Sequence, residues 1–176
     1  METLRIQTER LELIAATEEL AKAEINNRAE LSFLLCAQVP SAWPPEFNDI
    51  QTMTFTLQQL QGKPEQVGWW GWYFVLKGDK DVERVVIGYG GFKGQPDENA
   101  NVEVGYSIHK KYQRRGYGSE ATAGLVNWAF EQNVNSVTAE TLPELVASIG
   151  VLEKNNFVYM GKGSEEGVIL YRKDRP

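Results

Sequence analysis

The chain has 176 residues, of which 42% are hydrophobic and 24% are charged, and its formal net charge is −6. Residues 1–176 are therefore expected to form a single domain with a full core. The acidic balance argues against a nucleic-acid partner bound through phosphates, and no window approaches the roughly 18 apolar residues of a membrane helix. Because the N-terminus lacks an apolar signal core and Cys36 is the only cysteine, we expect a cytoplasmic protein without an internal disulfide.

The first third of the chain is predicted to contain one strand followed by helices. Alternating side chains indicate a strand over residues 10–16. Thr17, followed by two glutamates, is typical of a helix start, and helical character continues to about residue 35. After a proline-rich loop around Trp43, a further helix is predicted over residues 49–60. Its expected apolar face consists of Ile50, Met53, Leu57 and Leu60.

The middle of the chain is predicted to form three strands, over residues 69–76, 84–93 and 102–108. Gly78 and residues 96–101 mark the turns between them. In the third strand, apolar residues alternate with other residues at a period of two. Because short turns join sequential strands antiparallel, we expect an antiparallel meander.

The last third of the chain is predicted to mix helices and strands. Helices are expected over residues 118–133 and 144–155. Strands are expected over residues 136–141, 157–162 and 167–172. The complete order of elements indicates a mixed α+β sheet rather than a doubly wound parallel one.

The most distinctive segment, residues 109–118, lies between a predicted strand and a predicted helix. It holds four of the 18 basic residues of the chain and ends in Gly116 and Gly118. Free backbone N–H groups at a helix start bind anions, glycine lets the backbone approach a phosphate closely, and arginine adds charge-assisted hydrogen bonds. The segment therefore predicts a pyrophosphate site, and the alternative is a solvated basic turn.

The same glycines also fit a dinucleotide fingerprint, G-x-G-x-x-A, with Glu140 near the expected acidic position. That motif needs a buried strand that runs directly into its first glycine. Here the predicted strand ends near Ile108 and a hydrophilic basic loop follows, so the fingerprint is rejected. A nucleotide-phosphate binder remains an alternative, and it predicts comparable affinity for ATP or NAD.

Four segments resemble the GNAT superfamily of N-acetyltransferases. Residues 113–118, QRRGYG, resemble its Q/R-x-x-G-x-G/A motif, and residues 102–108 resemble the preceding strand. Residues 147–157 are similar to the A-S-x-x-x-L-E-K-x-G-F segment. Residues 8–13, TERLEL, resemble the T-x-R-L-x-L opening of the branch that contains ribosomal-protein N-terminal acetyltransferases, and the Trp43 loop is similar to one in that branch.

The resemblance implies a twisted, mostly antiparallel sheet with helices on both faces. It also implies that acetyl-coenzyme A lies in a splay beside the strand over residues 102–108, with its pyrophosphate on the amides that follow. The residues implied to bind acetyl-coenzyme A are Tyr106, Ile108, Gln113, Arg114, Arg115, Gly116, Tyr117, Gly118 and Ser119.

Two residues are candidates for proton transfer. Glu103 is the expected general base, since an amine must lose a proton before it attacks and a nearby carboxylate can accept it. The alternative is an ordinary polar residue on a half-exposed strand. The branch resemblance implies that Ser148 protonates the departing thiolate, and the alternative is a helix hydroxyl bonded to a backbone carbonyl.

Three positions depart from the family pattern. Leu152 replaces the tyrosine that serves as acid in many members, Leu145 replaces an asparagine, and Asn156 replaces the glycine before Phe157. The missing tyrosine and asparagine keep open a coenzyme A-binding module without turnover, which would be a sensor or an assembly partner.

Other residues carry weaker signals. The single histidine, His109, is interpreted as solvated and Cys36 as a small buried residue, so no metal site or Cys–His pair is expected. In the aromatic run, Trp70 and Trp72 are expected on one face and Trp69 on the other. One face is expected in the core and the other in an acceptor pocket or a homodimer contact, and Trp43 is a further acceptor-pocket candidate.

The sequence thus predicts an acetyl-coenzyme A-dependent N-acyltransferase that moves an acetyl group to a primary amine by direct attack. The branch resemblance suggests a protein N-terminus as the acceptor. A small amine, such as a polyamine, an amino acid or an antibiotic, is the alternative. No nucleic acid, membrane or metal partner is expected.

Overall fold

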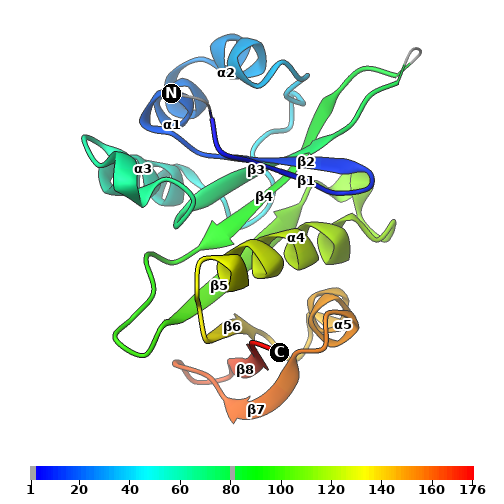
Figure 1. Ribbon diagram of the computed structural model, residues 1–176. Helices are drawn as coiled ribbons and strands as arrows, with labels where there is room; N and C mark the ends of the chain where they lie inside the picture. Colours follow the sequence, from blue (N-terminus) through cyan, green and yellow to red (C-terminus); the bar gives the residue numbers. More distant parts are fainter. Residues whose placement is uncertain (1–2, 80–81) are drawn as a thin grey trace.

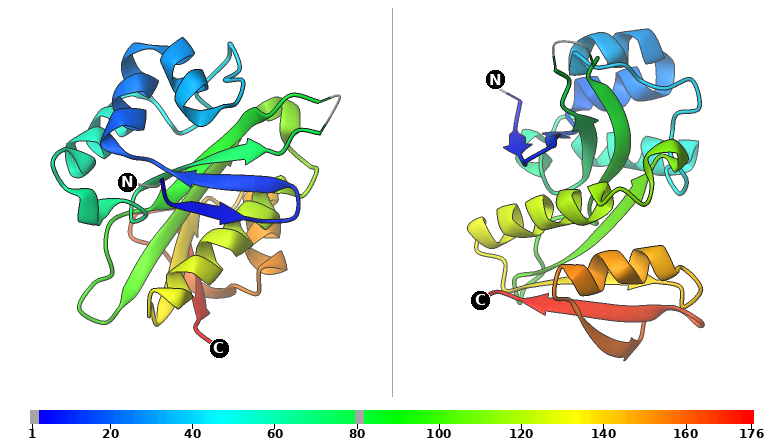
Figure 2. Two further views of the ribbon diagram at one scale, coloured as in Figure 1. Left: turned by 45° about the horizontal axis from the view of Figure 1, so that its top comes forward. Right: turned by 90° about the vertical axis from the view of Figure 1, so that its right-hand side faces the viewer.

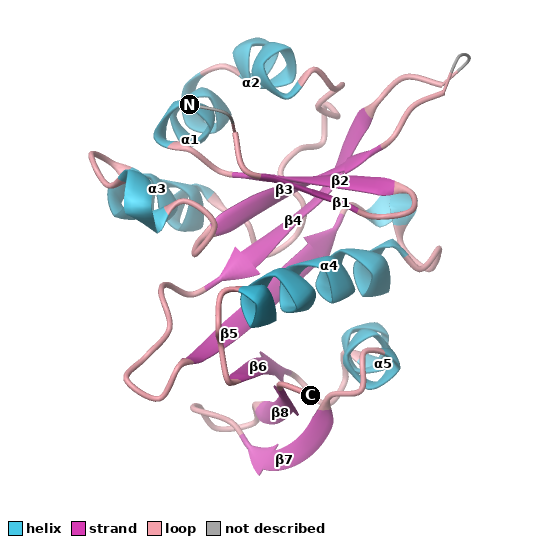
Figure 3. Ribbon diagram, in the orientation of Figure 1, coloured by secondary structure: helices cyan, strands magenta, loops and turns pink. Residues whose placement is uncertain are grey.

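The computed structural model of the protein describes residues 3–79 and 82–176 and is built on one eight-stranded sheet (Figure 1). The strands are β1 (Arg5–Gln7), β2 (Leu11–Ala15), β3 (Gly71–Leu76), β4 (Val85–Phe92), β5 (Asn101–Ile108), β6 (Ser136–Thr141), β7 (Val158–Lys162) and β8 (Ile169–Asp174). The helices, shown in cyan in Figure 3, are α1 (Glu18–Asn26), α2 (Arg28–Leu35), α3 (Ile50–Leu60), α4 (Tyr117–Glu131), α5 (Val146–Lys154) and the short 3-10 turns η1 (Pro64–Gln66) and η2 (Lys110–Tyr112).

The sheet is mixed and mostly antiparallel, with the strand order β1-β2-β3-β4-β5-β6-β8-β7. The β5–β6 pair is parallel and the other neighbouring strands are antiparallel. This arrangement confirms the predicted fold class, including the β3-β4-β5 meander. The strand β1 was not predicted, because three residues are too few to show a period of two.

The pairing between β5 and β6 is short. It runs over three residue pairs, from Asn101 with Ser136 to Glu103 with Thr138. Beyond Glu103 the two strands diverge, and the two halves of the sheet open away from each other (Figure 2, right). The second half of β5, which leads into the basic loop, therefore has an edge that β6 does not cover.

Helices cover both faces of the sheet, as predicted: α1, α2 and α3 lie over one face, while α4 and α5 lie over the other (Figures 1 and 2). Each face has its own apolar core because strand side chains alternate between the two sides. The core under α1–α3 includes Ile14, Leu20, Leu31, Leu35, Leu60, Tyr73, Val75 and Val86. The core under α4 and α5 includes Leu13, Trp72, Phe74, Val102, Val104, Leu125 and Leu152.

Side-chain caps define the first helices. The Thr17 hydroxyl accepts a hydrogen bond from the Leu20 N–H at 3.2 Å, and the Asp49 carboxylate accepts one from the Thr52 N–H at 2.9 Å. Both satisfy backbone donors that the first helical turn leaves without a partner. The predicted helix starts at residues 17 and 49 are confirmed.

Two predicted burial positions are wrong. Cys36 is exposed because it ends α2 in the left-handed conformation at the surface. Ile50 is 55% exposed, since the buried stripe of α3 consists of Met53, Thr56 and Leu60. In α5, which begins one residue after Leu145, the fully buried side chain is that of Leu152, while Leu145 is 36% exposed.

The aromatic run is divided between the two cores, but not as predicted. Trp72 is fully buried on the α4 side, where Trp69 also packs, whereas Trp70 packs on the α1–α3 side. Since β3 begins at Gly71, the strand alternation does not extend back to Trp69 and Trp70. Trp69, Trp72 and Trp128 contact one another at ring-centroid distances of 4.8 and 5.3 Å.

Within residues 3–79 and 82–176, no helix is long and apolar enough to cross a membrane. The same residues contain no group of three His, Cys, Asp or Glu side chains placed to share a metal ion.

Candidate active site

The basic loop connects β5 to α4 through η2, and it presents a row of backbone donors. In the described part of the chain, the N–H groups of residues 114–119 have no hydrogen-bond acceptor, and the next amide, that of Glu120, bonds to the Gly116 carbonyl at 3.1 Å. Gly116 has a φ of +81°, which glycine adopts without strain. The N-terminus of a 15-residue helix lies directly behind these amides. This arrangement suits a bound anion.

The side chains of the loop differ in what they contact. The Gln113 side-chain amide donates to the Ile108 carbonyl at 2.9 Å, so Gln113 fixes the exit of β5. Arg114 and Arg115 are exposed, and Arg114 has a φ of +60°. The Arg115 guanidinium lies 5.9 Å from the centroid of the Tyr112 ring. Both arginines are therefore accessible to an anion on the loop.

The start of α4 is packed tightly between β5 and α5. A Cβ atom on Gly118 would lie 3.3 Å from Val151 and 3.5 Å from Ile108, which leaves little room for a side chain. The Asn155 side-chain amide donates to the Ser119 carbonyl at 3.1 Å and so links α5 to the loop. Asn155 was not singled out in the sequence, because its partner lies 36 residues away.

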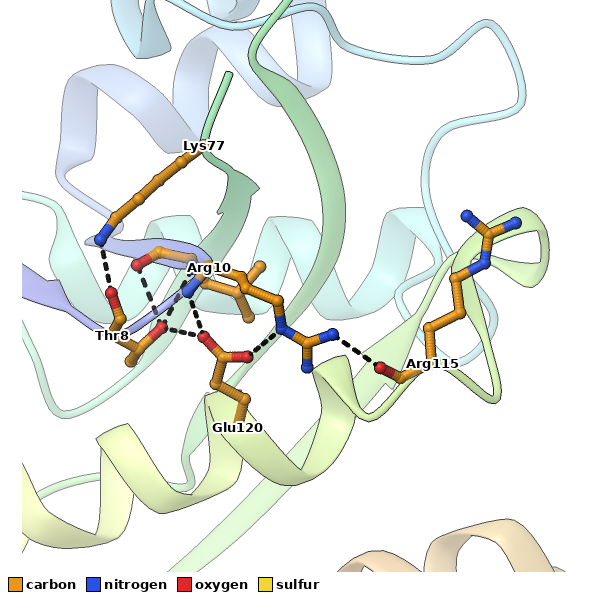
Figure 4. A network of polar contacts seen from close by, with 6 residues as sticks. Thr8, Arg10, Lys77, Arg115 and Glu120 are labelled. Atoms are coloured by element: carbon orange, nitrogen blue, oxygen red, sulfur yellow. Dashed lines mark hydrogen bonds and ion pairs between the residues drawn. The ribbon is translucent and has the colours of Figure 1, made fainter. Parts of the chain in front are cut away.

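A polar network fixes the loop from the other side (Figure 4). The Glu120 carboxylate accepts hydrogen bonds from the Thr8 hydroxyl at 2.6 Å, the Arg10 N–H at 2.6 Å and the Arg10 Nε at 2.7 Å. Arg10 also donates through Nη1 to the Arg115 carbonyl at 2.9 Å. Burial raises the pKa of Glu120, but these bonds outweigh it and the pKa is lowered, which favours the ionised carboxylate.

Glu103 lies on the face of β5 opposite to Tyr106. Gly105 and Ser107 share the Glu103 face. Ser107 pairs with Tyr89 of β4, and Tyr89 packs in the core under α1–α3, so Glu103 is on that side of the sheet. The Glu103 carboxylate forms an ion pair with Lys93, which is well exposed. As predicted, Glu103 is opposite the apolar side of the strand, and its side chain is 27% exposed.

Tyr106 and Ser148 meet on the α4–α5 side. The Tyr106 hydroxyl lies 3.1 Å from the Ser148 carbonyl oxygen, to which it donates, and 3.3 Å from Ser148 Oγ. Burial raises the pKa of Tyr106 to about 12, so its hydroxyl stays protonated. Because Ser148 contacts Tyr106 and Glu103 is on the other face of the strand, the two candidate catalytic groups lie on opposite sides of β5.

The polar cluster around Glu24 was not recognised from the sequence. Its carboxylate accepts hydrogen bonds from the Trp43 indole at 2.9 Å, the Tyr73 hydroxyl at 2.8 Å and the Asn48 amide at 3.1 Å. Burial raises the pKa of Glu24, although these three bonds oppose the shift. The cluster attaches the proline-rich loop to α1 and β3, so Trp43 has a structural partner on this side of the sheet.

A model of the acetyltransferase (GNAT) domain matches residues 10–158 of the chain. The chain belongs to this family. The relative YjdG of Bacillus subtilis (strain 168), an uncharacterized N-acetyltransferase, is 34% identical over 99 residues, which are 56% of this chain and 56% of YjdG. The chain spans about half the length of the curated relatives it matches.

Solved structures share the GNAT fold over almost the whole chain. Ribosomal-protein-S5-alanine acetyltransferase from Vibrio fischeri superposes with a TM-score of 0.67 at 20% identity, over 98% of this chain and 100% of that one. Microcin C7 self immunity acetyltransferase MccE, solved with acetyl-CoA and AMP, has a TM-score of 0.60 at 14% identity, over 95% of this chain and 93% of that one. At these identities the similarity concerns the fold alone.

The three departures from the GNAT pattern have distinct structural settings. Leu152 is fully buried in the core, so a hydroxyl there would have little access to solvent. Leu145 is at the N-cap of α5 and provides no side-chain cap. Asn156 has a φ of +61°, and asparagine is a common substitute for glycine in this left-handed conformation. Only the Asn156 departure is accommodated by its backbone.

Proposed function

We propose that residues 1–176 form a single GNAT domain that transfers an acetyl group from acetyl-coenzyme A to a primary amine by direct attack. The observation that carries the proposal is that the edge of β5 left uncovered by β6 leads to residues 114–119, whose six amides have no acceptor among the described residues. An extended arm can pair with a free strand edge, and a pyrophosphate can bind at a helix start. Acetyl-coenzyme A has both parts.

The chemistry of the donors fits this co-substrate. Bound acetyl-coenzyme A would supply the acetyl group as a thioester. The backbone of Tyr106 and Ile108 is proposed to hold the pantetheine arm. The loop is proposed to hold the pyrophosphate through Gln113, Arg114, Arg115, Gly116, Tyr117, Gly118 and Ser119. Exposed arginines supplement the backbone donors with positive charge in an otherwise acidic chain.

Two groups beside the uncovered edge of β5 are proposed to move protons during direct transfer. Glu103 is proposed to accept the proton that the ammonium must lose, either directly or through water. The amine nitrogen then forms a bond to the acetyl carbon while the carbon–sulfur bond breaks, and the nitrogen releases its second proton to water, which restores the proton that Ser148 gives up. Ser148, whose carbonyl is held by the Tyr106 hydroxyl, is proposed to supply a proton to the departing sulfur. During the transfer the nitrogen and the sulfur are bonded to the same carbon, so both would lie at the uncovered edge of β5, with Glu103 and Ser148 reaching them from its two faces.

The proposed acceptor is a protein N-terminus. This choice is supported by the similarity of residues 8–13 to the ribosomal-protein branch and by the fold shared with the Vibrio fischeri enzyme, whose acceptor is a ribosomal protein. A small amine is the second candidate. A cytoplasmic location is proposed from the composition of the chain.

The first test is titration calorimetry with acetyl-coenzyme A, with NAD and ATP as controls. Selective micromolar binding is expected. Equal binding of NAD would show that the loop is a general nucleotide-phosphate site and would overturn the proposal. Thiol release in the presence of peptides with free N-termini, with polyamines in a parallel series, then identifies the acceptor class.

A second candidate function is a coenzyme A-binding module without turnover, and the buried Leu152 in place of an acid favours it. It predicts selective binding but no thiol release above the rate of spontaneous hydrolysis with any acceptor. Acceptor-dependent thiol release that is abolished by Glu103→Gln would exclude it.

A further inference from the structure

Arg10 contacts the phosphate-site loop on both sides of Gly116, although it lies more than 100 residues earlier in the chain. Its Nη1 donates to the Arg115 carbonyl at 2.9 Å, and its guanidinium carbon lies 4.4 Å above the centroid of the Tyr117 ring. A Cβ atom on Gly116 would be 3.2 Å from Arg10 Nη2, so the glycine leaves room for this approach.

The Arg10 side chain is itself held in place. The Glu120 carboxylate binds both its Nε and its backbone N–H, and the Thr8 hydroxyl donates to the same carboxylate (Figure 4). The Glu120 side chain is 15% exposed and that of Arg10 is 41% exposed. The guanidinium fork therefore connects two anchored groups, a carboxylate on the first turn of α4 and a carbonyl before it.

The bonded carbonyl has a particular position relative to the helix. Arg115 lies four residues before Ser119, so its carbonyl is the acceptor that the Ser119 N–H would use if α4 began earlier. Arg10 occupies that carbonyl instead, and the Ser119 N–H has no acceptor among the described residues. The bond thus occupies the acceptor to which one amide of the row, that of Ser119, could otherwise turn.

We propose that Arg10 is a positioning residue for the pyrophosphate site: by binding the Arg115 carbonyl and stacking on Tyr117, it keeps the amides of residues 114–119 directed away from the helix. The inference rests on the proposed function, since it concerns the site for acetyl-coenzyme A. It gives a role to Arg10, the arginine of the T-x-R-L segment, which takes no part in the proposed proton transfers.

The test compares two donors in the wild type and in Arg10→Met, Arg10→Lys and Glu120→Gln variants. Acetyl-coenzyme A engages the loop, whereas acetyl-pantetheine lacks the pyrophosphate and does not. For Arg10→Met, the Kd and KM for acetyl-coenzyme A are expected to rise about tenfold or more, since a charge-assisted hydrogen bond is lost. The kcat with acetyl-coenzyme A and the kcat/KM with acetyl-pantetheine are expected to be unchanged.

The lysine variant separates position from charge. Lysine keeps the charge but cannot bond the carboxylate and the carbonyl with one planar fork, so Arg10→Lys is expected to lose most of the affinity that Arg10→Met loses. Wild-type affinity in Arg10→Lys would overturn the inference. Glu120→Gln is expected to raise the Kd in the same direction, and it carries the test with Arg10→Lys if Arg10→Met does not fold.

The matched control is Arg5→Met, because Arg5 is also an arginine near the N-terminus but pairs with Glu12 at 3.1 Å, away from the loop. It is expected to leave both donors unaffected. Equal losses for acetyl-coenzyme A and acetyl-pantetheine in Arg10→Met would indicate general structural damage and overturn the inference. If the wild type itself does not bind acetyl-coenzyme A, the proposed function fails instead.

Discussion

The two faces of the sheet differ in how far their polar groups are hydrogen-bonded within the chain. On the α4 side, the amides of residues 114–119 are left without acceptors among the described residues, and exposed arginines surround them. On the α1–α3 side, the Glu24 carboxylate has three donors from Trp43, Asn48 and Tyr73. Buried polar groups are normally satisfied, so a carboxylate with three internal donors indicates a structural role, even though Asn48 Oδ1 has no partner among the described residues, and a row of open donors indicates a ligand.

The network around Arg10 shares features with both the Glu24 cluster and the open amides. Its bonds are satisfied internally, as in the Glu24 cluster, but its effect is to keep the neighbouring amides open. A binding site of this kind needs both types of polar group: one to hold the backbone, and one left for the ligand. The comparison leads to four predictions.

The largest effect is expected at Glu103. Glu103→Gln should lower kcat by about 100- to 10,000-fold, since a positioned general base contributes a factor of that order. The Kd for acetyl-coenzyme A should not change, because the pyrophosphate loop is intact. Steady-state thiol-release assays measure kcat, and calorimetry measures the Kd. Glu98→Gln, on the exposed turn before β5, is the control, and an equal loss in both variants would contradict the assignment.

The next largest effect is expected in the Glu24 cluster. Glu24→Ala leaves the Trp43, Asn48 and Tyr73 donors without their acceptor and should lower the free energy of unfolding by about 1–3 kcal/mol. Urea unfolding measures this change. Glu19→Ala, at an exposed position of the same helix, should have little effect. An unchanged free energy of unfolding in Glu24→Ala would mean that the cluster does not hold the proline-rich loop.

A smaller effect is expected at Gly116. Its φ of +81° is costly for alanine, so Gly116→Ala should lower the free energy of unfolding by about 1 kcal/mol, and the Cβ close to Arg10 should also weaken binding of acetyl-coenzyme A. Gly150→Ala is the matched control, since Gly150 is helical and a Cβ there meets nothing within 4 Å. That variant should be neutral or more stable. Equal affinity in the two variants would argue against the close packing around Gly116.

The smallest effect is a difference in pH dependence between the two carboxylates. The pKa of Glu24 is raised, so its neutral form stabilises the fold below the ordinary value of 4.5, and this contribution is lost as pH rises through the folded pKa. The pKa of Glu120 is lowered, so its contribution is present above the ordinary value and is lost as pH falls through the folded pKa.

Unfolding from about pH 4 to about pH 8 tests the two signs. Relative to Glu24→Gln, the wild type should lose stability as pH rises. Relative to Glu120→Gln, it should lose stability as pH falls. The same slope for both pairs would show that the two carboxylates are in similar environments, contrary to the comparison of the two faces.

Local sequence was sufficient for most elements. The N-caps Thr17 and Asp49, the alternation along β5 and the basic segment before α4 depend on neighbours within a few residues, so the loop, the main helices and every strand except β1 could be predicted from the chain. The family motifs identified the fold for the same reason, since they are contiguous. The predicted alternation of side chains was wrong at Trp69 and Trp70, because β3 begins at Gly71 and not at residue 69.

Only the tertiary structure decided which distant groups meet. Arg10 and Glu120 are 110 residues apart, Glu24 and Tyr73 are 49 apart, and Tyr106 and Ser148 are 42 apart. No periodicity relates such pairs, because their contact depends on the order of strands in the sheet and on the faces that the helices cover. The sequence by itself therefore determined the elements and the type of ligand site, while the packing of the sheet decided which side chains hold that site in place.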